Sequence, residues 1–324
     1  MSQFSPGTRL RLLAWGAGQV VRHGRPALAL GFLGSIGDDL LCTAPVDEWR
    51  RRQAGRIWFF SRHPDLHRLI GPQVSLIPDD PRFQRLAARL GRPMRALGYS
   101  TFDPITDRDT PLREHIIADM CRRAGLSGTV RLRPHLKLAP SELADAAAWN
   151  GCVAVQSSSL TAALPMQNKQ WRLDRLQKVT GLLVARGERV VQIGTAGDPV
   201  LHGAADLRGK TSLRQTAAIL AQARLFVGIV GFVMHLARAV ECPAVIVYGG
   251  REPPALTGYL CNINVVGRTP CSPCWQRNRC DFEHACMETI AAAQVADAVE
   301  DALSRPRGPL FEETAMIGNA SAQN

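Results

Sequence analysis

The sequence predicts an α/β protein made of two similar halves. Short apolar runs that fit buried strands alternate with stretches of helical periodicity along most of the chain. In each half one apolar run leads into a glycine-containing turn and then a helix, at residues 26–40 and 225–240. A strand, a glycine turn and a helix in succession are typical of parallel sheets. We therefore expect two Rossmann-like domains that face each other across a cleft.

The composition is that of an ordinary globular protein. The chain has 324 residues, enough for two domains, with 46% apolar and 21% charged residues. No uninterrupted apolar segment is long enough to span a membrane, and the arginine-rich start lacks the cleavage site of a secretion signal. We therefore expect a cytoplasmic protein. In that compartment the nine cysteines predict thiols or metal ligands, not disulfides.

The positive charge is unevenly distributed. Residues 1–148 hold 22 of the 39 Lys and Arg residues and 14 of the 28 Asp and Glu residues, so they carry +8 of the net +11. Nucleic acid, an anionic membrane surface or an anionic acceptor would suit this charge, and so would simple solvation of the arginines. Few aromatic residues lie among the arginines, so we expect no nucleic-acid partner. An amphipathic helix over residues 9–21 could pack on the first domain or contact the inner face of the membrane.

We place the first domain at residues 1–148, of which 1–25 form an extension. Its main predicted strands are residues 26–36, 56–60 and 74–77. The turn after the first strand contains Gly34, Gly37, Asp38 and Asp39, and a helix is predicted to begin near residue 40. Either carboxylate could stabilise the first turn of the helix. One of them could instead project into the cleft, where open α/β sheets bind ligands.

We place the second domain at residues 149–304 and predict a flexible tail at 305–324. Its predicted strands are residues 152–156, 189–193, 225–227 and 244–248, and its main helices are 173–186, 214–223, 233–240 and 288–303. Gly228 and Gly231 lie in the turn after the third strand. They would let an anion approach the unpaired N–H groups of the next helix, which predicts a phosphate or diphosphate site.

Five segments occur together in a fixed order. They are GSIGDDLLCTAP at 34–45, NKQW at 168–171, GKTSLRQTAAILAQARLFVG at 209–228, GFVMHLARAVECPAVIVYG at 231–249 and CSPCWQRNRC…CM at 271–287. Together they resemble glycosyltransferase family nine, the ADP-heptose:lipopolysaccharide heptosyltransferases. The likeness extends from about residue 28 to residue 303. It implies the GT-B fold and inverting transfer of a sugar from a nucleotide-diphosphate donor to lipopolysaccharide or another surface glycan, without a catalytic metal or other cofactor.

The resemblance also implies roles for individual residues. Asp38 is the expected base that takes the proton of the acceptor hydroxyl, with Asp39 as the alternative. Lys169 is expected to bind the donor diphosphate. His235 either contacts the diphosphate or orients the turn from the core. The other expected diphosphate contacts are Gly231, Phe232 and Val233, and the expected nucleotide pocket consists of Gly194, Thr195, Thr211, Ser212 and Leu213.

The turn near residue 230 departs from the family's pattern. The family commonly has Asp, then Ser or Thr, then Gly where this chain has Val230, Gly231 and Phe232. A valine cannot accept hydrogen bonds from sugar hydroxyls. We therefore expect a donor sugar other than the heptose of ADP-heptose. A second hypothesis follows from the same change: a GT-B-fold binding or scaffold subunit without catalytic activity.

Four of the nine cysteines lie close together in the sequence: Cys271, Cys274, Cys280 and Cys286. Four thiolates within so short a loop predict a tetrahedral Zn or Fe site. Such a site would be structural, because four protein ligands leave no open position for catalysis. The alternative is four reduced thiols at a packed turn.

Overall fold

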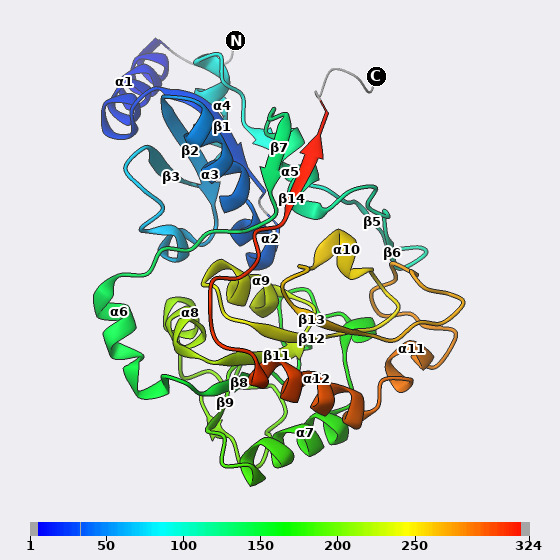
Figure 1. Ribbon diagram of the computed structural model, residues 1–324. Helices are drawn as coiled ribbons and strands as arrows, with labels where there is room; N and C mark the ends of the chain where they lie inside the picture. Colours follow the sequence, from blue (N-terminus) through cyan, green and yellow to red (C-terminus); the bar gives the residue numbers. More distant parts are fainter. Residues whose placement is uncertain (1–5, 33, 319–324) are drawn as a thin grey trace.

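The chain forms two α/β halves, each built around a parallel sheet (Figure 1). The computed structural model describes residues 6–32 and 34–318. The larger sheet belongs to the second half, and the segments that follow β11 and β12 contact the first half. The predicted class of two Rossmann-like halves is therefore confirmed.

The first half contains a four-stranded sheet in the order β3-β2-β1-β4. Its strands are β1 (Pro26–Gly31), β2 (Arg56–Ser61), β3 (Val74–Pro78) and β4 (Arg95–Ala96). Its other elements are α1 (Pro6–His23), α2 (Ile36–Leu41), α3 (Thr43–Arg52), η1 (Pro64–His67), α4 (Pro81–Arg89), β5 (Phe102–Asp103), β6 (Arg108–Asp109), α5 (Ile116–Arg123) and β7 (Gly128–Arg131). β1 ends five residues before the predicted position. The reason is that Ser35 caps α2, which starts at Ile36.

The second half contains a six-stranded parallel sheet in the order β10-β9-β8-β11-β12-β13. Its strands are β8 (Val153–Val155), β9 (Val190–Gln192), β10 (Ala205–Asp206), β11 (Leu225–Ile229), β12 (Ala244–Tyr248) and β13 (Ile263–Val266). Its helices are η3 (Gln167–Lys169), α7 (Leu173–Ala185), α8 (Leu213–Gln222), α9 (Phe232–Ala239), α10 (Pro254–Thr257), α11 (Ala285–Glu288) and α12 (Ala292–Ser304). The central strands β11 and β12 are buried along their whole length, as expected for a parallel sheet covered on both faces.

The segment just before the expected boundary at residue 148 packs against the second half. α6 (Pro140–Asp145) and η2 (Ala147–Trp149) pack against α8 of the second half. The guanidinium of Arg214, at the start of α8, donates to Glu142 of α6 over 2.6 and 2.7 Å. It also donates to the Leu66 carbonyl of the first half over 2.7 Å. Residues 132–152, which we call the crossing segment, connect the two halves. Arg214 therefore links this segment to both halves.

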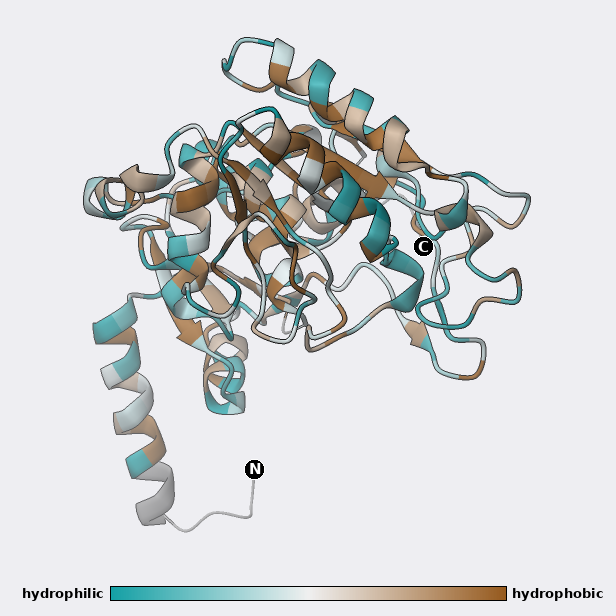
Figure 2. Cartoon of the chain, turned by 90° about the horizontal axis from the view of Figure 1, so that it is seen from below, coloured by the Kyte–Doolittle hydropathy of each residue, from teal (hydrophilic) through white to brown (hydrophobic). Residues whose placement is uncertain are grey.

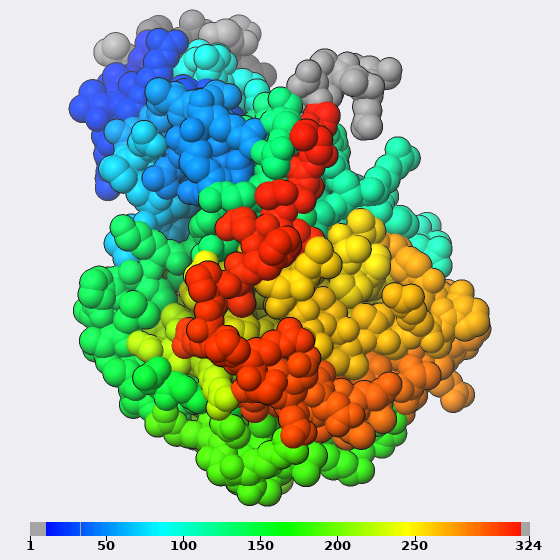
Figure 3. All heavy atoms as spheres, viewed as in Figure 1, coloured from blue at the N-terminus to red at the C-terminus, as the bar shows by residue number. Residues whose placement is uncertain are grey.

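Part of the segment that was expected to be a flexible tail instead forms a strand. β14 (Thr314–Ile317) pairs antiparallel with β7 of the first half. Its last residue, Ile317, is buried in the core of that half. Figure 3 shows this segment in red, crossing from the second half to the first. Residues 319–324 lie outside the described residues.

Helix α1 extends away from the body of the first half (Figure 2). Its contact with α4 includes the rings of Trp15 and Phe83, whose centroids are 5.2 Å apart. The helix exposes Leu13 and Val21, which are 66% and 87% exposed. Within residues 6–32 and 34–318, no helix is both long and apolar enough to cross a membrane.

Candidate active site

The glycine turns of the two halves meet face to face. The first turn leads from β1 into α2, and the second leads from β11 into α9. A methyl group built on Gly37 of α2 would lie 3.7 Å from the Cα of Phe232, the first residue of α9. Two turns that are almost 200 residues apart in the sequence are therefore in contact at the junction of the two halves.

The carboxylate of Asp38 is held at this junction by three donors. The backbone N–H and the hydroxyl of Ser35 donate to Oδ2 over 2.9 and 2.7 Å, which completes a capping box at the start of α2. The Tyr99 hydroxyl donates to Oδ1 over 2.6 Å. Burial, followed by the charge of Asp38, raises the pKa of Tyr99 well above its ordinary value, so the hydroxyl keeps its proton. The side chain of Asp38 thus has a fixed orientation.

Asp39 points instead into the first half. Its Oδ2 accepts hydrogen bonds from the Ser61 hydroxyl over 2.7 Å and from the backbone N–H of His63 over 3.2 Å. Its Oδ1 lies 3.5 Å from Nε2 of His67, and both side chains are buried. Asp39 therefore joins α2 to the end of β2. Of the two carboxylates in the turn, only Asp38 lies on the side that faces the second half.

The start of α9 is open. A methyl group built on Gly231, the N-cap residue, would have no heavy atom within 4 Å. The first N–H groups of α9 carry the positive end of the helix dipole and can bind an anion. Val230, by contrast, is only 3% exposed and belongs to the hydrophobic core. The turn therefore offers backbone donors and space, and no side-chain acceptor at residue 230.

His235 supports the turn from inside the core. Its Nδ1 lies 2.7 Å from the Tyr259 hydroxyl, and the ring is 8% exposed. Burial, followed by the charge of Lys169, lowers the pKa of His235 to about 3, so the imidazole is neutral. The geometry favours the second of the two roles expected for this residue, that of orienting the turn.

Lys169 is held by a carboxylate that the sequence analysis did not single out. Its Nζ lies 2.8 Å from Oε1 of Glu252, and the side chains are 15% and 5% exposed. Burial lowers the pKa of Lys169, an effect that Glu252 opposes. Although burial raises the pKa of Glu252, Lys169 and Arg251 keep it below its ordinary value. We regard the pair as ionised, because Glu252 has two cationic partners at contact distance.

The pair continues into a network that joins the two halves. The guanidinium of Arg251 contacts Glu252 and also Asp109 of the first half. Asp109 forms a second ion pair, with Arg277, over 2.6 Å. Arg251 and Asp109 are 4% and 7% exposed. Each buried charge thus has an opposite partner, as buried ions require.

The predicted nucleotide residues gather near the carboxyl end of β9. The backbone N–H of Thr195 donates to Asp198 over 2.9 Å, and the N–H of Gly209 donates to the Gly194 carbonyl over 2.8 Å. Ser212 is the N-cap of α8 and forms a capping box with Gln215. Two further predicted residues, Thr211 and Leu213, flank Ser212. The structure therefore places all five predicted residues beside the end of β9 and the start of α8.

The four clustered cysteines do not form a metal site in this structure. Among the described residues, no group of three or more His, Cys, Asp and Glu side chains is arranged to hold a metal ion. Burial raises the pKa of Cys274, and the nearby Cys271 and Cys286 thiols add to this. The sulfur of Cys280 instead accepts a hydrogen bond from the backbone N–H of His284 over 3.3 Å.

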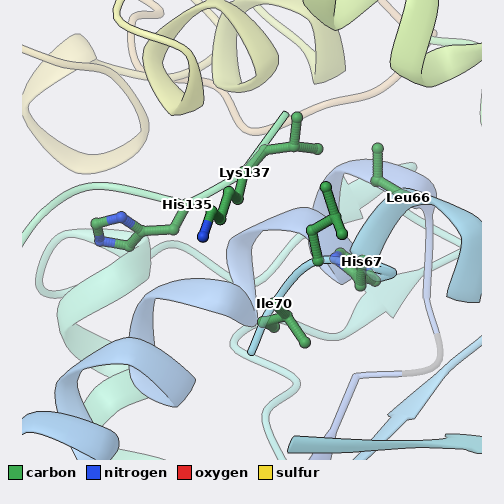
Figure 4. Close-up of a pocket in the computed structure, with 7 residues that line it drawn as sticks. Leu66, His67, Ile70, His135 and Lys137 are labelled. Atoms are coloured by element: carbon green, nitrogen blue, oxygen red, sulfur yellow. The ribbon is translucent and has the colours of Figure 1, made fainter. Parts of the chain in front are cut away.

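Two cavities differ greatly in size. Figure 4 shows the smaller one, between the loop that carries Leu66, His67 and Ile70 and the crossing segment that carries His135 and Lys137. Its volume is about 10 Å³, no more than one water molecule occupies. The larger cavity has a volume of about 300 Å³ and lies beyond the ends of β12 and β13. Glu252 is one of the residues that line it.

Comparison with known proteins supports the relationship that the motifs indicate. Residues 158–285 match the model of glycosyltransferase family 9 (heptosyltransferase). The resemblance read from the sequence is confirmed. The matched stretch includes Lys169, the turn at Gly231 and Glu252. No curated protein matches this chain in sequence.

Solved structures establish the fold. The iron-containing dodecameric glycosyltransferase TibC from enterotoxigenic E. coli is similar at 19% identity and a TM-score of 0.65, over 86% of this chain and 76% of that one. E. coli ADP-heptose lipopolysaccharide heptosyltransferase II is similar at 16% identity and a TM-score of 0.61, over 86% and 98% of the two chains. E. coli heptosyltransferase WaaC with ADP is similar at 14% identity and a TM-score of 0.52, again over 86% and 98%. The fold is GT-B, as the resemblance implied.

The sequence analysis missed two residues of the site. Glu252 follows the buried strand β12 and two glycines, so it lies at the carboxyl end of a parallel strand, as Asp38 does. The same rule that singled out Asp38 could therefore have found it. Tyr99 carried no such signal, because it lies three residues after the two-residue strand β4.

Proposed function

We propose that this chain is an inverting glycosyltransferase that moves a sugar from a nucleotide-diphosphate donor to a surface glycan or glycolipid. The observation that carries the proposal is the junction of the two turns. The fixed carboxylate of Asp38 lies in the turn that faces the open N-terminus of α9. A base on one wall and an anion-binding turn on the other are what a direct displacement of a diphosphate requires.

In the proposed reaction, the acceptor oxygen bonds to the anomeric carbon from the side of the first half. The bond from that carbon to the diphosphate oxygen breaks at the same time, and its electron pair stays on the diphosphate. The proton of the acceptor hydroxyl passes to Asp38. Ser35 and Tyr99 keep the carboxylate oriented throughout.

The negative charge of the departing diphosphate is met by the second half. The N–H groups of Gly231, Phe232 and Val233 lie at the positive end of α9. Lys169 supplies a cation once the diphosphate competes with Glu252 for it. In this scheme the charge is balanced without a catalytic metal. The nucleoside would lie beyond the end of β9, near Thr195 and Ser212.

We propose a donor sugar other than that of ADP-heptose. The buried side chain of Val230 offers no acceptor where the family commonly has aspartate. The same observation favours the second hypothesis, a binding or scaffold subunit that keeps the fold without activity. Two of the three hydrogen bonds to Asp38 belong to the capping box of α2. The third, from Tyr99, has no part in capping and favours an oriented base, and hence the enzyme.

The first half would hold the acceptor, and its excess of basic residues suits an acidic or phosphorylated glycolipid. The exposed Leu13 and Val21 of α1, together with Arg11 and Arg22, form a mixed apolar and basic helix surface. Such a surface suits peripheral contact with an anionic membrane. We therefore propose that the protein acts in the cytoplasm, at the inner face of the membrane.

A structural zinc or iron ion at the four cysteines also stays a proposal, supported by the spacing of Cys271, Cys274, Cys280 and Cys286 in the sequence. Elemental analysis of untagged protein is expected to find about one metal ion per chain. Four thiols that titrate freely in the native protein would contradict this proposal.

The proposed function is tested with the purified full-length chain. Calorimetry with ADP, UDP and GDP is expected to detect binding of at least one nucleoside diphosphate. An activity assay with ADP-heptose, ADP-glucose, UDP-glucose and GDP-mannose is expected to detect release of the diphosphate from one of the last three, with ADP-heptose used poorly. Binding without any turnover on lipopolysaccharide-type acceptors would favour the scaffold. Absence of nucleotide binding would contradict both.

A further inference from the structure

The 300 Å³ cavity lies next to the proposed diphosphate site and has no assigned occupant. It begins where β12 and β13 end, at the carboxyl edge of the six-stranded sheet. In that sheet β12 is the neighbour of β11, whose end leads into the anion-binding turn of α9. The cavity and the anion-binding turn therefore lie at the ends of neighbouring strands of one sheet.

The cavity is of the size and composition that suit a sugar ring. Its volume of about 300 Å³ is at the lower end of the range for small-molecule sites. Pro253, Pro254 and Pro273 contribute apolar surface to its wall, and Thr269 and Ser272 contribute hydroxyl-bearing residues. Sugars present both C–H faces and hydroxyl groups, and this wall offers partners for both kinds of surface.

Gly250 allows the loop that carries Ser272 to pack closely against the end of β12. A methyl group built on Gly250 would collide with the hydroxyl of Ser272. The loop from Thr269 to Ser272 is held by a hydrogen bond of 2.9 Å from the backbone N–H of Ser272 to the Thr269 carbonyl. The loop can therefore approach the end of β12 only because residue 250 has no side chain.

Glu252 joins the cavity to the diphosphate site. It lines the cavity, and its Oε1 lies 2.8 Å from the ammonium of Lys169. An ionised carboxylate has about four lone-pair positions. Lys169 occupies one on Oε1 and Arg251 occupies one on Oε2, so each oxygen can accept one more hydrogen bond. Sugar hydroxyls are suitable donors.

We propose that this cavity binds the transferred sugar of the donor, and that Glu252 determines which sugar is accepted. Glu252 would supply, from the end of β12, the carboxylate that the turn lacks at Val230. The inference rests on the proposed function, because it extends the same donor from its diphosphate into the cavity. The donor would then lie along the carboxyl edge of the sheet, with its base near β9, its diphosphate at α9 and its sugar beyond β12 and β13.

The proposal is tested by two variants of the full chain. Glu252→Gln removes the charge with little change in shape, and Val266→Phe fills part of the cavity from the end of β13. Calorimetry would measure the affinity for whichever of ADP, UDP and GDP binds most tightly, and the affinity for the corresponding sugar nucleotide. Both variants are expected to weaken binding of the sugar nucleotide by about tenfold or more. Glu252→Gln would weaken hydrogen bonds to a charged group, whereas Val266→Phe would occupy part of the space of the sugar. Binding of the free diphosphate is not expected to weaken, because its contacts lie at Lys169 and α9, and in Glu252→Gln a neutral amide competes less strongly for Lys169.

Matched controls are available outside the site. Glu300→Gln removes the charge of a carboxylate that is 61% exposed, and Leu260→Phe enlarges a side chain that is 68% exposed. Neither is expected to change either affinity. Equal losses for diphosphate and sugar nucleotide in Glu252→Gln would show that Glu252 only positions Lys169 and would overturn the proposal. So would a Val266→Phe variant that raises the KM of the acceptor alone. If the wild-type chain binds no nucleoside diphosphate, the proposed function itself fails, and the sugar site with it.

Discussion

The two glycine turns have the same local architecture and opposite chemistry. In the first half, β1 leads into α2, and the turn presents a carboxylate that three hydrogen bonds orient. In the second half, β11 leads into α9, and the turn presents backbone N–H groups and an empty space in front of Gly231. The first turn can accept a proton, whereas the second can bind an anion.

The proposed sugar site would place an acidic group one strand away from the second turn. The apolar Val230 removes the side-chain acceptor from the second turn, while Glu252 brings a buried carboxylate to the end of the next strand. All parallel strands end at the same edge of a sheet, so a polar group can shift by one strand and still face the same ligand. The predictions below test this division of roles, from the largest expected effect to the smallest.

Separate substitution of the two neighbouring aspartates should give the largest difference in the rate of transfer. Asp38→Asn is expected to lower the rate of transfer by about two to four orders of magnitude, because it removes the base. Binding of the diphosphate should be nearly unchanged. In Asp39→Asn, turnover per folded molecule should stay close to that of the wild type, whereas thermal stability should fall, since Asp39 bonds Ser61 and His63. Near-normal turnover in Asp38→Asn would remove that residue from the mechanism.

The buried network between the halves should affect stability next most strongly. Arg251→Met leaves Asp109 and Glu252 each with one cation fewer, and we expect a loss of about 3 kcal/mol in the free energy of unfolding. Arg186→Met is the matched control, because the ion pair of Arg186 with Glu300 is exposed and worth less than about 1 kcal/mol. Urea denaturation measures both. Equal effects of the two substitutions would contradict the role of the network.

Lys169 provides a test of the second turn alone. Lys169→Ala is expected to weaken binding of a nucleoside diphosphate by about 1.5–3 kcal/mol, the cost of a lost hydrogen bond to a charged group. Lys178→Ala, on the exposed face of α7, serves as the control in the same calorimetric titration. An unchanged affinity in Lys169→Ala would show that the diphosphate binds elsewhere.

Because two histidines are buried in their neutral form, we expect the protein to lose stability in mild acid. Nδ1 of His115 accepts from the N–H of Ile117 over 3.2 Å and Nε2 lies 2.8 Å from the Gly258 carbonyl, a pattern that only the neutral ring can form. Burial lowers its pKa to about 4, and burial with the charge of Lys169 lowers that of His235 to about 3. The unfolded chain therefore binds protons first. The contribution of the two histidines to the free energy of unfolding is largest above about pH 6.5 and falls as the pH drops towards 4. Between pH 7 and pH 5 the loss is about 2 kcal/mol per histidine. Denaturation at the two pH values measures this, and His115→Asn should remove about half of the difference.

Much of the fold could be predicted because its signals are local. β12 has the predicted bounds, since a run of buried β-branched residues lies between Pro243 and Gly249. α8 begins within one residue of its predicted start, because Ser212 caps it. The pairing of β14 with β7 joins residues about 185 positions apart, and no local pattern shows such a partner. The ion pair of Glu142 with Arg214 likewise joins residues that are far apart in the sequence.

The candidate site, like the fold, has parts that local sequence could predict and parts that it could not. Asp38 and the turn at Gly231 could be found because each follows a buried strand within a few residues. The partners that determine what these groups do lie far away in the sequence: Tyr99 for Asp38 and Glu252 for Lys169. Whether an aspartate is an oriented base or a structural acceptor depends on those partners, so Asp38 and Asp39 could be distinguished only in three dimensions.

The most direct test of the account is a structure of the full chain with its tightest-binding nucleoside diphosphate. We predict that the terminal phosphate lies within about 2.7–3.2 Å of the N–H groups at Gly231, Phe232 and Val233. Nζ of Lys169 should then contact the phosphate instead of lying only against Glu252, and Asp38 should face the phosphate across the junction of the two turns. A diphosphate bound away from the start of α9, with the Lys169–Glu252 pair undisturbed at 2.8 Å, would contradict the central claim.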